Sequence, residues 1–437
     1  MNLLLEERLS KWADVYEKNG YLNGSILIAS QGNILLNRGF GIANIEHSIA
    51  NKPTTKFRIG SLTKAFTSLG IFLLHEKGSL NIQDSISKYL PDLPHHNEIT
   101  IYHCLTNTSG LPNFTSFPDF WFTTMRLPST LQEIIDSFKN LELNFQPGNS
   151  FEYSNSGYAI LTAIIEKVSG MPYGEYIKEE ICLPLGMYNT GCDDGIKIIP
   201  NLASGYSFWE NPIHAAYADL SFPLGIHGLY STTEDLLIWD QALNSSKLLN
   251  RELMKKLFTP NRDSYACGWV VSEILGRPCT HHFGDISGYC SQFIRFVDDQ
   301  VTIIFLSNMN VTPVSHIAEE IAKVIFEEEV SLPIPAVPIS IPNPGVLAGE
   351  YFIEKEQNRI LDITLKNGEL YLTIAKMYGV LYKFKLVPVR HELTKTTFIT
   401  EMINEQLVFN YSLSGEIEYV EYINYYGEKF MAYKQNS

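Results

Sequence analysis

A serine and a lysine stand three residues apart in the stretch SLTK, at Ser61 and Lys64. If a helix begins near Ser61, both side chains lie on one face, and the hydroxyl lies at the helix N-terminus, where free N–H groups favour developing negative charge. A buried lysine with a lowered pKa could then take the serine proton, which indicates a nucleophile–base pair without histidine. Taken alone, the pattern also fits a helix cap with a solvated lysine. It recurs at Ser85 and Lys88, which we interpret as an exposed helix or loop.

A tyrosine and an asparagine, Tyr153 and Asn155, stand two residues apart in a predicted extended loop before a helix that starts near Gly157. Both side chains could face one cleft, because a phenol can relay a proton and an amide can hold a substrate amide. The spacing fits a plain turn equally well, and it recurs at residues 21–23 and 422–424.

The stretch HFGD, from His282 to Asp285, reads as the edge of a strand. Its glycine, Gly284, would let a substrate backbone come close, and His282 could anchor a carboxylate. The preceding His281 should point to the other face of a regular strand, so we do not expect a metal site from this pair. The alternative interpretation is an ordinary strand with surface histidines.

The elements that must position these side chains lie in the first 330 residues. Alternating apolar residues predict one hairpin near the start and one near the end, over residues 24–29 with 33–38 and 293–297 with 301–306. Helical patterns fill the middle, over residues 62–73 and 158–168. This order predicts an α+β fold: one antiparallel sheet containing both ends of the domain, flanked by helices, plus a helical subdomain.

A linker follows at residues 331–344, where five prolines predict a stiff extended segment after an acidic amphipathic helix over residues 314–330. Beyond it, residues 345–437 alternate like antiparallel strands, with tight turns at Asn367-Gly368 and Ser414-Gly415. We therefore predict a mixed domain over residues 1–330 and a small β-barrel or sandwich over residues 345–437.

Composition narrows the class of protein. The 437 residues are 45% apolar and 19% charged, which excludes collagen-like, low-complexity and wholly disordered chains. The net charge of −15 makes nucleic acid an unexpected partner. The six cysteines show no metal-binding spacing, so we expect buried thiols and no metal or cofactor.

The first 20 residues predict an amphipathic helix with one apolar face, made by Leu5, Leu9, Trp12 and Tyr16. They lack the basic start and cleavage site of a signal peptide, and the most apolar later stretch, residues 65–74, is too short to span a bilayer. The expected location is therefore the cytoplasm.

The order Ser-x-x-Lys, Tyr-x-Asn, His-x-Gly resembles the serine β-lactamase and penicillin-binding-protein-like superfamily. Flanking stretches resemble the same superfamily: FRIGS, CLTNTSGLP, QPGNSFEYSN and GLYSTTEDL, at residues 57–61, 104–112, 146–155 and 228–236. The resemblance covers roughly residues 10–330. The His-x-Gly motif resembles the class C-like branch, whose bacterial and archaeal members include D-amino-acid peptidases and esterases. The tail is similar to the lipocalin-like barrel of some members.

The resemblance implies a serine hydrolase that works through an acyl-enzyme without a cofactor. Ser61 would be the nucleophile, Lys64 the base, and Tyr153 a proton donor to the leaving group. The N–H groups of Ser61 and Asp285 would form the oxyanion hole. Asn155 would contact the acyl amide of the substrate.

His282 would steer a terminal carboxylate along the strand edge at Gly284, in place of the lysine of other branches. Asp285 occupies a position that is usually small, so it could repel an anionic substrate or prefer a free amine. Since histidine is also only partly charged near neutral pH, small D-amino-acid peptides or esters are expected ahead of β-lactams.

Two further alternatives stay open. The chain could be a catalytically inactive binding or assembly protein that kept the cleft. The C-terminal domain could bind a ligand, cover the cleft, mediate self-association or only stabilise the chain. Aromatic residues around positions 114–127 and 201–223, Tyr206 and Phe208 among them, suggest an apolar substrate pocket or core packing.

Overall fold

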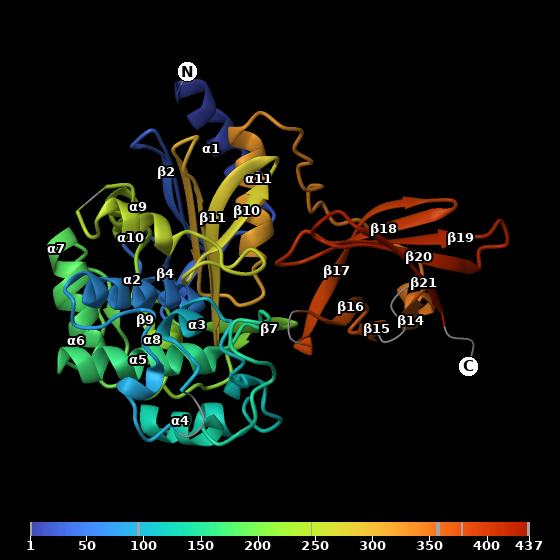
Figure 1. Ribbon diagram of the computed structural model, residues 1–437. Helices are drawn as coiled ribbons and strands as arrows, with labels where there is room; N and C mark the ends of the chain where they lie inside the picture. The colour runs from blue at the N-terminus through green and yellow to red at the C-terminus, as the bar shows by residue number, and fades with distance from the viewer. Residues whose placement is uncertain (1, 94–96, 246, 355–358, 377–378, 435–437) are drawn as a thin grey trace. The chain divides into compact units, whose positions relative to one another are not determined.

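The computed structural model describes residues 2–93, 97–245, 247–354, 359–376 and 379–434 (Figure 1). The chain divides into two compact units. The larger comprises Gly24–Ser204 and Ala216–Asn308, and the smaller comprises Met1–Asn23, Gly205–Ala215 and Met309–Ser437.

The larger unit is built on a six-stranded antiparallel sheet with the order β10-β11-β12-β13-β1-β2. Its strands are β1 (Gly24–Ser30), β2 (Asn33–Phe40), β10 (Val270–Ile274), β11 (Arg277–Ile286), β12 (Tyr289–Phe296) and β13 (Val301–Ser307). β1 pairs with β13, so the two predicted hairpins are confirmed and lie side by side in one sheet. This confirms the expected sheet that contains both ends of the domain.

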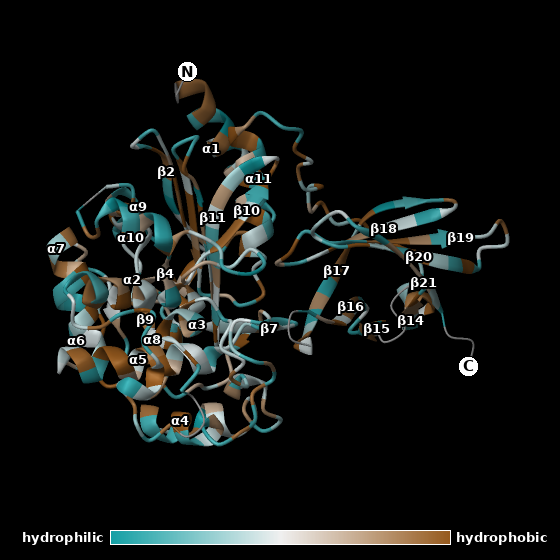
Figure 2. Ribbon diagram, in the orientation of Figure 1, coloured by the Kyte–Doolittle hydropathy of each residue, from teal (hydrophilic) through white to brown (hydrophobic). Residues whose placement is uncertain are grey.

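The helical part of this unit packs around α2 (Thr63–Glu76), in which every residue from Thr63 to Leu74 is buried. α2 contacts α5 (Asn155–Ser169) and α8 (Leu224–His227), and Figure 2 shows hydrophobic residues along much of α5. The remaining α-helices are short: α3 (Ile101–Leu105), α4 (Leu131–Phe138), α6 (Tyr173–Ile177), α7 (Leu183–Leu185), α9 (Thr233–Leu243) and α10 (Arg251–Leu257). The predicted helices after Ser61 and near Gly157 are confirmed.

Short strands and 3-10 turns complete the larger unit. The strands are β3 (Ile42–Asn44), β4 (Ile49–Ala50), β5 (Phe57–Arg58), β6 (Gly191–Cys192) and β9 (Leu229–Ser231). The 3-10 turns are η1 (Gly60–Leu62), η2 (Ile86–Lys88), η3 (Phe114–Ser116) and η4 (Thr124–Arg126), and η5 (Lys178–Cys182) is a π-helical turn. Lys88 in η2 is exposed and pairs with Asp84 at 2.7 Å, which confirms our interpretation of the second Ser-x-x-Lys stretch.

Two helices of the smaller unit, α1 (Asn2–Lys18) and α11 (Val314–Ile325), contact each other. Of the predicted apolar face of α1, Leu9, Trp12 and Tyr16 are buried and Leu5 is half-buried. α11 ends at Ile325, five residues before the predicted end at 330. The acidic run at 327–329 explains the difference, because carboxylates destabilise a helix C-terminus. Residues 328–341 then form neither helix nor strand.

Eight strands of the smaller unit close into an antiparallel barrel, because β16 pairs with both β15 and β17. After the 3-10 turn η6 (Pro344–Leu347) come β14 (Gly349–Ile353), β15 (Ile360–Lys366), β16 (Glu369–Ala375), β17 (Leu381–Glu392), β18 (Lys395–Thr400), β19 (Gln406–Tyr411), β20 (Ile417–Ile423) and β21 (Lys429–Lys434). The predicted turn after β15 is confirmed, with positive φ at Asn367 and Gly368.

A hairpin from the middle of the chain joins the barrel sheet. β7 (Tyr206–Trp209) pairs in parallel with β17, and β8 (Asn211–His214) forms the outer edge. Tyr206 and Phe208 are buried in the hydrophobic core of the barrel. Core packing, and not a substrate pocket, therefore explains these two aromatic residues. Among the residues that the structure describes, no helix has both the length and the hydropathy to cross a membrane.

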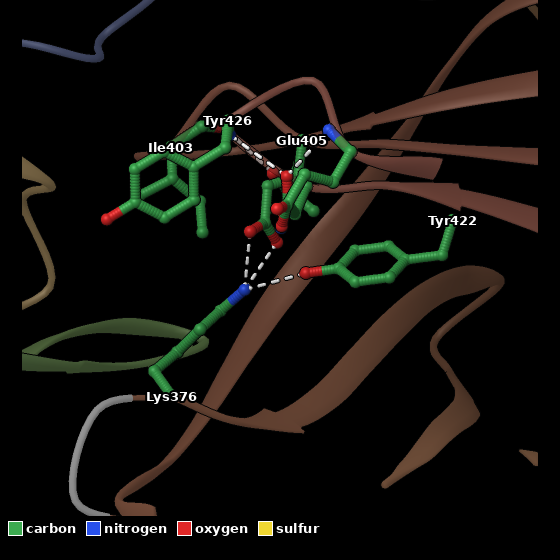
Figure 3. Close-up of polar contacts among 8 residues, drawn as sticks. Lys376, Ile403, Glu405, Tyr422 and Tyr426 are labelled. Carbon is green, nitrogen blue, oxygen red and sulfur yellow. Dashed lines mark hydrogen bonds and ion pairs between the residues drawn. The ribbon is translucent and has the colours of Figure 1, made fainter. Parts of the chain in front are cut away.

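An ion pair is buried in the barrel, and Figure 3 shows its members pointing toward one another. The Lys376 amine lies 2.5 and 2.6 Å from the two carboxylate oxygens of Glu405 and 2.9 Å from the hydroxyl of Tyr422. The Glu405 side chain has no exposed surface, and that of Lys376 is 8% exposed. Because burial removes both charges from water, each depends on the other.

Replacing Glu405 by glutamine is expected to lower the free energy of unfolding of the barrel by about 3–5 kcal/mol, because the ammonium of Lys376 loses its counter-charge. Calorimetric unfolding of the full chain measures the effect. The paired replacement Lys376→Met with Glu405→Leu removes both charges and should unfold close to wild type. A Glu405→Gln protein as stable as wild type would contradict the prediction.

Candidate active site

Ser61 lies in the turn between β5 and α2, and two glycines let β11 approach that turn. Gly60 has a φ of +54°, and a Cβ on it would lie 2.5 Å from the backbone nitrogen of Asp285. A Cβ on Gly284 would lie 2.0 Å from the carbonyl oxygen of Ile59. Larger residues at either position would push the strand away from the turn. The turn of Ser61 and the backbone of Asp285 are therefore neighbours.

Lys64 lies one turn further along, on the same face as Ser61. Its side chain is 0% exposed, and Nζ lies 3.0 Å from Ser61 Oγ and 2.9 Å from the carbonyl oxygen of Ile226 in α8. Burial holds the pKa of this amine well below its ordinary value of 10.5. A neutral amine in hydrogen-bond contact with a hydroxyl can accept its proton.

Tyr153 enters the site from the extended stretch before α5. Lys64 Nζ lies 5.0 Å from the centre of its ring. Asn107 holds the chain on both sides of Tyr153: its carbonyl oxygen accepts from Glu152 N at 3.0 Å, and its Oδ1 accepts from Ser154 N at 3.2 Å. Asn107 adopts a left-handed φ of +53°, which asparagine tolerates better than most residues. The structure thus brings Ser61, Lys64 and Tyr153 together.

Asn155 begins α5 beside this group. Its Nδ2 donates to Thr115 Oγ1 at 2.9 Å, and its backbone nitrogen donates to Asn113 Oδ1 at 3.0 Å. Its Oδ1 is buried and has no hydrogen-bond partner among the described residues. That oxygen is the atom that could accept an amide N–H of a substrate.

His282 lies near Tyr153 with a side chain only 4% exposed, and both of its ring nitrogens have partners in the protein. Nδ1 is 2.6 Å from the carbonyl oxygen of Phe283, which can only accept, so Nδ1 carries the hydrogen. Nε2 is 3.2 Å from the hydroxyl of Tyr265, which donates to it when the ring is neutral. Burial, with a smaller contribution from Lys64, lowers the pKa of His282 to about 3. The expected role of His282 as a carboxylate anchor gains no support from this geometry.

Two more titratable residues have their backbones close to this group, Asp285 against Gly60 and His227 directly after Ile226. Asp285 is half-buried, and burial raises the pKa of its carboxyl to about 7. His227 ends α8, next to the carbonyl that holds Lys64, and burial lowers the pKa of its ring to about 3. Neither side chain has a hydrogen bond or ion pair with any residue that the structure describes.

Sequence reasoning missed Asn107, Tyr265 and His227. Asn107 lies inside the stretch CLTNTSGLP and His227 directly precedes GLYSTTEDL, whereas none of the four stretches contains or adjoins Tyr265.

His281 Nε2 lies 3.0 Å from Ser272 Oγ, so its hydrogen-bond partner differs from those of His282. Within the described ranges, no group of three or more His, Cys, Asp or Glu side chains could hold a metal ion.

The model of the family described as Beta-lactamase matches residues 9–325. Penicillin-binding protein 4* of Bacillus subtilis (strain 168) is 35% identical over 317 residues, covering 65% of this chain and 68% of that protein. The match spans about two thirds of the length of three curated relatives, between 63% and 68%.

Two solved structures share the fold. The octameric penicillin-binding protein homologue from Pyrococcus abyssi has a TM-score of 0.67 at 24% identity, covering 98% of this chain and 99% of that one. The D-amino acid amidase from Ochrobactrum anthropi SV3 has a TM-score of 0.65 at 23% identity, covering 74% of this chain and 98% of that one.

Proposed function

The chain belongs to the beta-lactamase family and is a serine hydrolase, and from this premise we propose that Ser61 forms an acyl-enzyme with an amide or ester substrate. The 3.0 Å contact between Lys64 Nζ and Ser61 Oγ carries the proposal. Because the amine is buried and its pKa is lowered, it is suited to deprotonate the hydroxyl near neutral pH.

In the proposed reaction, Lys64 accepts the proton of Ser61 as Oγ attacks the substrate carbonyl. The oxyanion accepts hydrogen bonds from the backbone N–H groups of Ser61 and Asp285. The proton passes through Lys64 and Tyr153 to the leaving group, whose bond to the carbonyl carbon breaks. Water then attacks the acyl ester, its proton returns to Ser61 Oγ by the same groups, and the acid is released.

The proposed substrates are small peptides, with D-amino-acid peptides first, then esters, and β-lactams only weakly. The partnerless oxygen of Asn155 supports an acyl group that carries an amide N–H. The neutral His282 supports a low rank for β-lactams, since their carboxylate finds no charged partner there. The D-amino acid amidase of similar fold is consistent with this order.

A fluorophosphonate or fluorescent penicillin probe tests the proposal on the native chain. We expect one labelled peptide, with the added mass on Ser61, together with hydrolysis of p-nitrophenyl esters. A chain that binds ligands saturably but neither labels nor hydrolyses an ester, D-peptide and β-lactam panel would instead be a binding or assembly protein.

We also propose that residues 1–330 form the hydrolase domain and residues 345–437 a separate lipocalin-like barrel, joined by residues 331–344. The lack of helix and strand over residues 328–341 supports a linker. The compact units differ from this division in one respect: α1, α11 and the inserted hairpin belong to the unit of the barrel.

A second copy of this chain is the proposed protein partner, bound through the barrel. The barrel sheet ends on β8, in which all four residues are exposed. An exposed strand edge favours pairing with another chain, and the apolar Ile213 lies on it. Light scattering of the full chain should give a mass above that of one copy, and the mass of a monomer would contradict the proposal.

A further inference from the structure

The carbonyl of Ile226, in the four-residue helix α8, accepts a hydrogen bond from Lys64 Nζ at 2.9 Å. A neutral amine has two N–H groups and one lone pair, and a carbonyl oxygen can only accept. One N–H of Lys64 is therefore directed at Ile226. One of the two remaining positions on Nζ is the lone pair that can take the proton of Ser61. The orientation of the base thus depends on where this carbonyl lies.

The helix α8 gives that carbonyl little support by itself. A helix of four residues makes few hydrogen bonds of its own, and Leu224 within it has a φ of +25°, which residues other than glycine rarely adopt. Gly225 lets other elements come close, because a Cβ on it would lie 2.3 Å from Thr162 Oγ1 and 3.0 Å from Thr67 Oγ1. The position of α8 is therefore set by the helices packed against it.

Two threonines of α2 bond to the backbone on either side of Ile226. Thr67 Oγ1 lies 2.6 Å from the carbonyl oxygen of Gly225. The N–H of Leu229 donates to Thr63 Oγ1 at 3.1 Å. Both threonine side chains are 0% exposed, so water does not compete for these bonds. The helix that carries the base therefore also holds the segment that orients it.

A tyrosine hydroxyl determines the direction of the hydrogen bond made by Thr67. Tyr173 Oη lies 2.8 Å from Thr67 Oγ1, and burial raises the pKa of Tyr173 well above its ordinary value of 10.0, so this hydroxyl keeps its hydrogen. Thr67 accepts from Tyr173 and donates to the carbonyl of Gly225, which can only accept. The carbonyl of Thr63, at 3.3 Å, is the more distant acceptor for Thr67.

Resting on the proposed function, we propose that Thr67 is a positioning residue for the base: its hydroxyl holds α8 so that the carbonyl of Ile226 keeps Lys64 beside Ser61. Thr67 has no exposed surface, so a substrate binds without touching it. Its hydroxyl is therefore expected to affect kcat and to leave KM nearly unchanged.

Replacing Thr67 by valine keeps the shape of the side chain and removes the hydroxyl. We expect kcat for p-nitrophenyl esters to fall by about 10-fold to 100-fold, the size of a misplacement of about 1 Å, with KM close to wild type. Thr67→Ser restores the hydroxyl and should return kcat toward the wild-type value. Thr400→Val is the matched control, because it removes a buried hydroxyl that donates to the carbonyl of Ile403 at 2.7 Å in the barrel, and it should keep the wild-type kcat.

The Lys64→Met background separates positioning from a general change in the fold. If Thr67 acts through Lys64, Thr67→Val should hardly lower the residual rate of Lys64→Met, whereas a general defect would lower it by the same factor as in wild type. Equal factors in the two backgrounds, or a wild-type kcat in Thr67→Val, would overturn the inference. Should Thr67→Val fail to fold, its combination with Tyr173→Phe takes its place, since it also removes the hydroxyl that has lost its acceptor.

Crystal structures separate this inference from the proposed function, because they need no turnover. In Thr67→Val, Lys64 Nζ should lie beyond hydrogen-bond distance of the Ile226 carbonyl, while Thr67→Ser should keep the contact. An unchanged contact in Thr67→Val would contradict the inference, although labelling of Ser61 could still uphold the hydrolase. A displaced Lys64 in a chain that labels nowhere would support the positioning role and contradict the hydrolase.

Discussion

Replacing Ser61 by alanine is expected to lower kcat for p-nitrophenyl esters by a factor on the order of 10⁶, the loss seen when a serine hydrolase loses its nucleophile. The physical reason is that no acyl-enzyme can form without the hydroxyl, while Lys64 and the backbone donors stay in place. Initial rates at saturating substrate measure the effect.

The chain supplies its own control for this change. Ser85 stands in the same Ser-x-x-Lys spacing, but it caps a 3-10 turn and bonds to Ser87. Ser85→Ala should therefore keep the wild-type rate. Similar losses in Ser61→Ala and Ser85→Ala would show that the hydroxyl of Ser61 has no special role.

Replacing Lys64 by methionine is expected to lower kcat/KM by about 10²-fold to 10⁴-fold, the usual contribution of a general base. Methionine keeps an apolar side chain of similar length in the buried site, so the loss reports the missing amine. Lys88→Met removes an exposed lysine of the same motif spacing and should have no effect.

The pH dependence gives a second readout of the same base. Only the neutral amine accepts a proton, so kcat/KM of wild type should rise with pH through the pKa of Lys64. Because burial lowers that pKa, the rise should be complete well below pH 10.5. In Lys64→Met this limb should disappear from the residual activity. An unchanged profile would assign the base to another group.

Local patterns predicted the parts of the site that depend on local geometry. Ser61 and Lys64 face each other because residues three apart on a helix share a face, whatever the rest of the fold does. The hairpins and their turns follow from alternation and from residues such as Asn367 that tolerate positive φ. Such contacts need only a few neighbouring residues.

The partners of His282 could not be predicted in this way. The expected role as a carboxylate anchor assumed that a ring nitrogen of His282 was free, but the hydroxyl of Tyr265 contacts Nε2. Tyr265 lies in the loop before β10, and the position of this loop depends on how β10 pairs with β11. Asn107 likewise accepts a hydrogen bond from the backbone next to Tyr153, although more than forty residues separate the two in the sequence. Contacts of this kind follow from tertiary packing, which a single sequence does not display.

The pairing of β1 with β13 has a consequence for synthesis of the chain. Ser25 pairs with Leu306, so the central sheet joins strands that leave the ribosome nearly 300 residues apart. At ~5–20 residues per second, β1 waits roughly 15–55 s for this neighbour. During that time one edge of β1 is paired with β2, and the edge that later pairs with β13 has no strand partner. Until β13 has been synthesised, this open edge can pair with a strand of another chain, which favours misassociation.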